Sequence, residues 1–111
     1  MRPSLPAFLL LASLATLGGT VSAAEDVRRV GDAAGRLAVA EIYCNGHITE
    51  QGRALFAEMR RQDWATFSQG VLEGANALAR GYVLGMDACA GILARFGKQG
   101  IDYRGLWQLN D

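Results

Sequence analysis

The sequence lacks the surplus of positive charge that nucleic-acid-binding proteins carry. Its 111 residues include 11 basic and 11 acidic side chains. The longest basic blocks are the pairs Arg28-Arg29 and Arg60-Arg61. Binding to a phosphate backbone depends on a clustered basic face. The scattered charges therefore predict that nucleic acid is not a partner.

Side chains that carry catalysis or bind metals are also few. His47 is the only histidine, and the only two cysteines, Cys44 and Cys89, are not spaced as Cys-x-x-Cys. These residues lack the fourth ligand of a closed zinc site. No glycine-rich loop joins a strand to a helix as in a phosphate site, and no two carboxylates are embedded in an apolar run. The sequence thus predicts no enzymatic activity, no cofactor and no metal ion.

Three residues remain as candidates for chemistry. His47 follows Cys44 by three positions, and a thiol beside an imidazole can act as nucleophile and base. A disulfide would remove that thiol, which favours an exposed turn histidine. Glu41 and Asp87 are the candidate carboxylates, although both are better interpreted as residues at the rim of the core. A small enzyme using His47 or a carboxylate is the least favoured function.

The first 23 residues have the organisation of a secretory signal peptide. Arg2 gives a positive start, residues 5–17 are apolar, and small residues precede a cleavage point after Ala23 or Ala24. An uncleaved leader acting as a membrane anchor is the alternative. The segment loses hydrophobicity after Leu17, however, whereas a spanning helix needs about 20 apolar residues. We therefore expect a mature domain of residues 24–111 in the periplasm or secreted, with no stable membrane insertion.

Small exported domains commonly compensate for a modest core with a disulfide. Cys44 and Cys89 are the only pair within the chain. Cys44 ends the apolar stripe of an expected first helix over residues 26–44, and Cys89 lies in a later apolar stripe. Two cysteines that face the same core can approach to bonding distance. A structural Cys44–Cys89 disulfide is therefore predicted.

Helical periodicity dominates the mature chain. The stripe of the first helix has the spacing of one helix face, and its members are Val30, Ala33, Leu37, Ala40 and Cys44. Asn45-Gly46 ends it. Thr49 is expected to cap a second helix running to about Arg61, with Leu55, Phe56 and Met59 turned inward.

Asp63 is expected to cap a third helix. Its large residues recur on one side as far as residue 96: Trp64, Phe67, Val71, Ala75, Leu78, Tyr82, Cys89, Leu93 and Phe96. The pattern leaves open whether this helix is continuous or bends near Gly81 or Gly85. Gly97 and Gly100 terminate it, and Asp102 is expected to cap a last helical turn. No strand is expected. The predicted fold is all-α, a small three- to four-helix bundle with one disulfide.

A second stripe on the third helix consists of small residues. Its members are Gly70, Gly74, Ala77, Gly81, Gly85 and Ala88. Glycine inside a helix costs up to about 1 kcal/mol relative to alanine, and aligned small residues let another helix backbone approach closely. The stripe is interpreted as a seam against the first or second helix, as a groove for a partner or a second copy, or as plain disruption of the helix.

Two families resemble this chain. Residues 67–74 (FSQGVLEG) resemble the glycine-spaced helix of secreted, disulfide-bonded immunity proteins that protect against type VI secretion effectors. Those proteins typically carry a cysteine where this chain has Ser68. An exported helical domain with one disulfide is also similar in architecture to the periplasmic acid-stress chaperones of enteric-type bacteria. The first resemblance implies binding to a protein partner, and the second implies chaperone activity.

Together these patterns favour binding over catalysis. The leading hypothesis is a protein-interaction module of the periplasm, of the immunity, inhibitor or envelope accessory type. It implies an unknown protein partner, with homodimerisation as an open alternative. A periplasmic stress chaperone is the second hypothesis.

Overall fold

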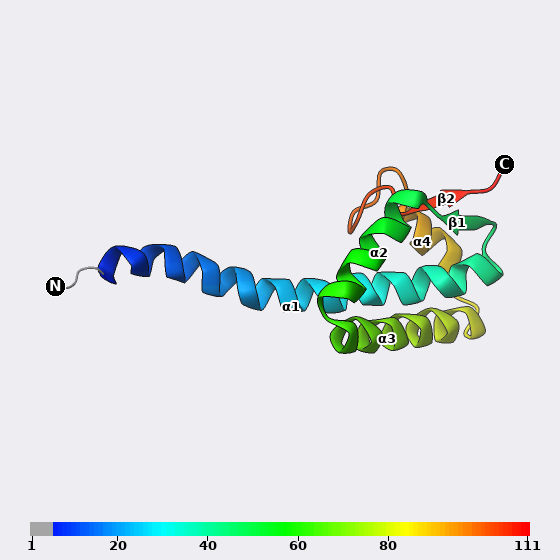
Figure 1. The fold of residues 1–111 in the computed structure, drawn as a ribbon. Helices are drawn as coiled ribbons and strands as arrows, with labels where there is room; N and C mark the ends of the chain where they lie inside the picture. The colour runs from blue at the N-terminus through cyan, green and yellow to red at the C-terminus, as the bar shows by residue number, and fades with distance from the viewer. Residues whose placement is uncertain (1–5) are drawn as a thin grey trace.

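The computed structural model describes residues 6–111, with side chains from Glu25 onward. Its elements follow in the order α1 (Pro6–Tyr43), β1 (Gly46–Ile48), α2 (Glu50–Gln62), α3 (Trp64–Val83), α4 (Ala88–Phe96) and β2 (Trp107–Leu109). Helices dominate the fold and a Cys44–Cys89 disulfide links two of them. The predicted helical bundle with one disulfide is therefore confirmed (Figure 1).

The centre of the bundle is a pair of parallel helices, α1 and α3, which contact each other directly. The chain returns through α2 from the end of α1 to the start of α3 (Figure 1). The apolar stripe predicted for residues 26–44 faces the core along its whole length. Phe56 of α2 is buried, and Leu55 and Met59 pack against the core while partly exposed. The largest fully buried side chains are Leu37, Ile92, Phe96 and Leu106.

Two of the three predicted helix caps, Thr49 and Asp63, are present. The hydroxyl of Thr49 accepts a hydrogen bond from the Gly52 N–H (3.1 Å) and donates one to the Gly105 carbonyl (2.6 Å). The carboxylate of Asp63 accepts bonds from the N–H and the hydroxyl of Thr66 (3.1 and 2.7 Å). Each side chain satisfies an N–H group that has no partner inside the helix. The starts of α2 and α3 were therefore readable from local sequence.

The long helical pattern is interrupted near Gly85, one of the two expected positions. α3 ends at Val83, and Gly85 in the turn has a φ of 78°, which glycine adopts without steric cost. Asp87, expected at the rim of the core, instead caps α4 by accepting the Ala90 N–H (3.1 Å). Because the direction changes here, the expected single stripe does not hold. Leu93, which follows the turn, is exposed. Trp64, at the start of α3 and far from this turn, is also exposed.

The expectation that the chain has no strands was wrong. Residues 107–109 form β2 instead of a helical turn, and β2 pairs antiparallel with β1, His47 lying opposite Gln108. A Cβ on Gly46 would overlap the indole ring of Trp107 and stand 2.9 Å from the Gln108 carbonyl oxygen, so glycine is required for this pairing. Asp102 does not cap a helix. Its carboxylate pairs with Arg95 (2.6 Å).

Candidate functional site

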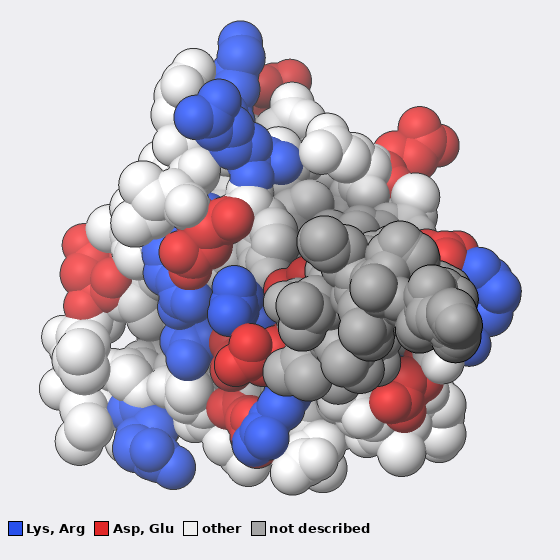
Figure 2. Space-filling view, turned by 90° about the vertical axis from the view of Figure 1, so that its left-hand side faces the viewer, with Lys and Arg blue, Asp and Glu red and all other residues white. Residues whose placement is uncertain are grey.

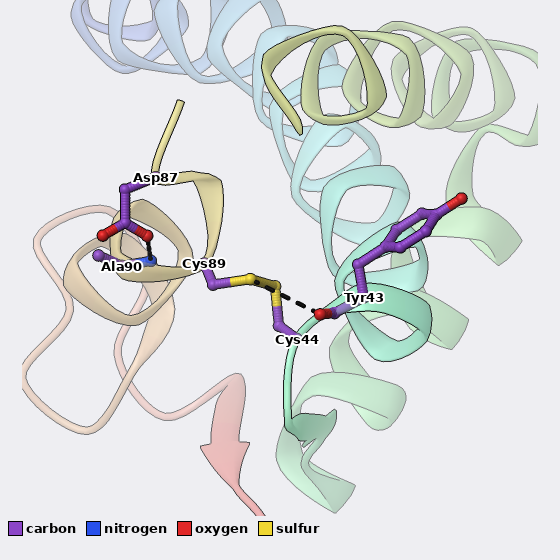
Figure 3. Close-up of a disulfide and its surroundings, with 5 residues drawn as sticks. All are labelled: Tyr43, Cys44, Asp87, Cys89 and Ala90. Atoms are coloured by element: carbon purple, nitrogen blue, oxygen red, sulfur yellow. Dashed lines mark hydrogen bonds between the residues drawn. A yellow bond between two sulfur atoms is a disulfide. The ribbon is translucent and has the colours of Figure 1, made fainter. Parts of the chain in front are cut away.

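The disulfide joins the end of α1 to the first turn of α4. The Cα atoms of Cys44 and Cys89 lie 5.6 Å apart, and the Cys89 sulfur is 3.9 Å from the Tyr43 carbonyl oxygen (Figure 3). No cysteine in the described part of the chain is free. Cys44 therefore has no thiol to act as a nucleophile beside His47.

The other candidate catalytic residues hold the fold together. Nδ1 of His47 lies 2.8 Å from the Asn110 side-chain oxygen, across the two strands. The carboxylate of Glu41 accepts the N–H of Ile48 (2.9 Å), which ties the last residue of β1 to α1. Asp87 caps α4. These side chains do not converge on one cleft, and residues 25–111 contain no group of three His, Cys, Asp or Glu side chains arranged to hold a metal ion.

The first half of the small-residue stripe lies against α1. A Cβ on Gly70 would stand 2.9 Å from the Asp32 nitrogen, and one on Gly74 would stand 2.7 Å from the Asp32 carbonyl carbon. Glycines of α1 face α3 in the same way, since a Cβ on Gly35 would lie 2.8 Å from the Ala75 nitrogen. Backbone atoms of the facing helix occupy the space that a side chain at any of these glycines would need. The two helices thus touch backbone to backbone along this seam.

The second half of the stripe has a different environment. A Cβ on Gly81 would meet only the Met86 sulfur, at 3.9 Å, and one on Gly91 would meet nothing within 4 Å. Ala77, Gly81 and Ala88 line a hollow between α3 and α4, together with Gly91. We call this hollow the apolar groove. Gly85 lies in the turn beside it.

Large apolar side chains are exposed at the end of the bundle where α1 and α3 both finish. We call this surface the apolar end, and it consists of Ile42, Tyr43, Tyr82, Val83, Leu84 and Met86. The rings of Tyr43 and Tyr82 stack with their centroids 4.5 Å apart, which joins the two helices. Val83 is 81% exposed and Ile42 72%. Sequence analysis missed this surface: it placed Tyr82 in the apolar stripe of the third helix, and the other five residues form no pattern of their own.

The opposite end of the bundle carries a charged cleft of about 650 Å³. Its charges are largely paired: Arg28 with Glu73, Arg36 with Asp32 (2.6 Å) and Arg95 with Asp102 (2.6 Å). Figure 2 views this end and shows basic and acidic side chains interleaved. Burial raises the pKa of Tyr103, which also lines the cleft. The mixture of signs gives the cleft no strong preference for an ion of either charge.

No family model, curated protein or solved structure matches the chain. In the part of the chain that the structure describes, no helix is both long and apolar enough to cross a membrane.

Proposed function

We propose that this protein is a periplasmic protein-interaction module that binds its partner through the apolar end. The observation that carries the proposal is the exposure of six large apolar side chains in and beside the last turns of α1 and α3. Together they present on the order of several hundred Å², the range in which exposed apolar patches mark interaction sites. Tyrosine and methionine, both present here, are enriched in protein interfaces. The immunity, inhibitor and envelope accessory types named above would all act by binding a protein partner.

The apolar end is also held rigidly, which favours binding because little order has to be gained. Tyr43 precedes Cys44, and Met86 lies three residues before Cys89, so the disulfide joins the two sides of this surface. The stacked rings of Tyr43 and Tyr82 make a second connection. These two connections hold the ends of α1 and α3 and the start of α4 together in the free protein.

The proposed leader leaves the bundle intact when it is removed. α1 projects beyond the bundle before residue 25 (Figure 1), and Val27 is the first of the described core residues. Disulfides also persist in oxidising compartments such as the periplasm. We therefore expect protein recovered from the periplasm to begin at Ala24 or Glu25, as measured by N-terminal sequencing. Recovery of the full-length chain in the membrane fraction would instead support an uncleaved anchor.

Site-specific photocrosslinking in the periplasm tests the binding surface. A photoreactive residue in place of Val83 should give a discrete adduct with a partner because Val83 is the most exposed member of the apolar end. The same residue in place of Ala57, which is exposed on α2, is the control and should give none. An adduct of twice the protein's mass would identify a second copy as the partner. Absence of any adduct at both Val83 and Ile42 would contradict the proposal.

A stress chaperone is the alternative, since exposed apolar surface also binds unfolded clients. The acid-activated form of this hypothesis requires loss of tertiary structure on mild acidification. The carboxylates with perturbed pKa values argue against it. Hydrogen bonds from Arg61, Thr66 and Arg28 lower the pKa values of Glu58, Asp63 and Glu73, respectively.

A carboxyl group whose pKa is lower in the folded chain stabilises the fold above its unfolded pKa, which is about 4. That stabilisation is lost only as the pH falls through the lower, folded pKa. We therefore expect the near-ultraviolet circular dichroism to persist from pH 7 to about pH 4. Loss of the signal between pH 6 and pH 4, accompanied by dye binding and suppression of client aggregation, would favour the chaperone.

A further inference from the structure

We propose that the thioether of Met86 is a site of reversible oxidation that regulates binding at the apolar end. The inference rests on the proposed function, because Met86 belongs to the surface through which the partner is proposed to bind. The oxidant is a peroxide and the product is methionine sulfoxide. Oxidation converts a flexible apolar side chain into a polar one, so the oxidised protein releases its partner.

Met86 is the more accessible of the two methionines that remain once the leader is removed. The sequence contains Met1, Met59 and Met86, and Met1 belongs to the proposed leader. Met86 is 64% exposed. Met59 is partly buried in α2 and packs against the core. Because the oxidant reaches a thioether from solvent, Met86 should react before Met59.

The turn between α3 and α4 holds Met86 in this exposed position. Gly85, with a φ of 78°, allows the chain to change direction after α3. The Met86 N–H donates to the Gly81 carbonyl (3.0 Å), and the Met86 carbonyl accepts the Ala88 N–H (2.8 Å). The backbone of Met86 is therefore hydrogen-bonded within the turn, and its side chain is the part available to a partner or an oxidant.

No cysteine thiol competes with Met86 for the oxidant. A cysteine thiolate is a strong nucleophile that peroxides oxidise readily. Residues 25–111 contain no free cysteine, since Cys44 and Cys89 are joined in the disulfide. The exposed thioether is therefore the sulfur of the mature chain that is open to oxidation.

The reaction transfers one oxygen atom from the peroxide to sulfur. A lone pair on the Met86 sulfur attacks one oxygen of hydrogen peroxide, so that an S–O bond forms and the O–O bond breaks. The departing hydroxide takes the proton of the transferred oxygen and leaves as water. Sulfur is oxidised by two electrons and the peroxide is reduced by two. A methionine sulfoxide reductase reverses the change with a dithiol as reductant, giving the thioether, water and a disulfide.

The sulfoxide oxygen would lie among aliphatic side chains of the apolar end. Val83 and Leu84 precede Met86 in the sequence and are 81% and 68% exposed, and their side chains carry no hydrogen-bond donor. An acceptor that is buried against a partner without a donor loses its bonds to water. Binding of the oxidised protein should therefore be about tenfold weaker.

Mass spectrometry locates the reaction. After brief treatment of the periplasmic protein with hydrogen peroxide, the tryptic peptide that contains Met86 should gain the mass of one oxygen atom before the peptide that contains Met59. The near-ultraviolet circular dichroism should not change, because Met86 is not one of the core residues. Oxidation of Met59 first, or loss of the dichroism when Met86 alone is oxidised, would overturn the proposal.

The photocrosslinking expected at Val83 measures the effect on binding. The protein with the photoreactive residue is treated with peroxide, freed of it, mixed with untreated periplasmic extract and irradiated. The yield of the adduct should fall about tenfold, and methionine sulfoxide reductase with dithiothreitol should restore it, whereas dithiothreitol alone should not. In a Met86→Leu background peroxide should leave the yield of that variant unchanged. A Met59→Leu background is the matched control and should keep the response to peroxide.

The outcomes separate this inference from the proposed function. An adduct that keeps its full yield after Met86 is oxidised, or a loss of equal size in the Met86→Leu background, would overturn the regulation and leave the binding surface in place. Absence of any adduct before oxidation would contradict the proposed function and this inference together.

Discussion

Replacing Gly74 with leucine should lower the free energy of unfolding by about 3 kcal/mol or more, the upper range for overpacking. A Cβ at this position would stand 2.7 and 2.9 Å from backbone atoms of Asp32 in α1. Backbone in a packed helix cannot turn aside as a flexible side chain can. The parallel helices would have to separate, and the contact between Gly35 and Ala75 would separate with them.

Gly91→Leu is the matched control for this effect. Both glycines lie inside helices, and helix propensity alone makes leucine more favourable than glycine by several tenths of a kcal/mol. Gly91 has open space around it, so its variant should be slightly more stable than the parent. The two substitutions should therefore change stability in opposite directions in urea unfolding followed by circular dichroism. Equal stabilisation by both would show that the seam between α1 and α3 is not closely packed.

Removing the disulfide should have a comparable effect. Cys44 and Cys89 are 45 positions apart, and cross-linking a loop of this length restricts the unfolded chain by about 4 kcal/mol in the chain-entropy model. The double variant Cys44→Ser, Cys89→Ser should lose most of this amount in urea unfolding. The parent protein should approach the same stability in a reducing agent, whereas the double variant should not respond to the agent.

The oxidised state can be checked directly by mass. Unreduced protein from the periplasm should be two mass units lighter than its fully reduced form and should resist alkylation. Thiols of Cys44 and Cys89 that react readily in the native protein would contradict the disulfide, and would restore the pairing of Cys44 with His47 as a chemical hypothesis.

The features predicted correctly depend on neighbours in sequence. Thr49 and Asp63 cap helices that begin one residue later, and each caps through bonds within three positions. The buried stripe of α1 follows directly from its period. The strands depend instead on pairing across the chain, with Ile48 opposite Trp107. The two three-residue strands are far apart in the sequence and no hairpin joins them, so no local pattern indicated the pair.

The surfaces described above also combine features that local sequence predicts with features that depend on distant packing. The small-residue stripe was visible because its spacing is helical, but its two environments depend on how far α1 runs beside α3. Gly74 lies next to Asp32, whereas Gly81 meets the turn residue Met86. The apolar end could not be predicted, because Ile42 and Val83 lie at the same end of the bundle only when α1 and α3 finish at the same level. Exposure of this kind is set by the packing of distant elements.

The position of the C-terminus bears on how the protein can be labelled. The Asn110 N–H donates to the Asn45 carbonyl (3.1 Å), and the two asparagine side chains are also joined (3.2 Å). The last residues therefore lie beside Asn45, which follows the end of α1. Figure 1 shows the C-terminus at the end of the bundle where α1 and α3 finish. An affinity tag or fluorescent fusion at the C-terminus would sit next to the apolar end and obstruct a partner. A tag inserted just before Glu25 would lie at the far end of the bundle and leave that surface accessible.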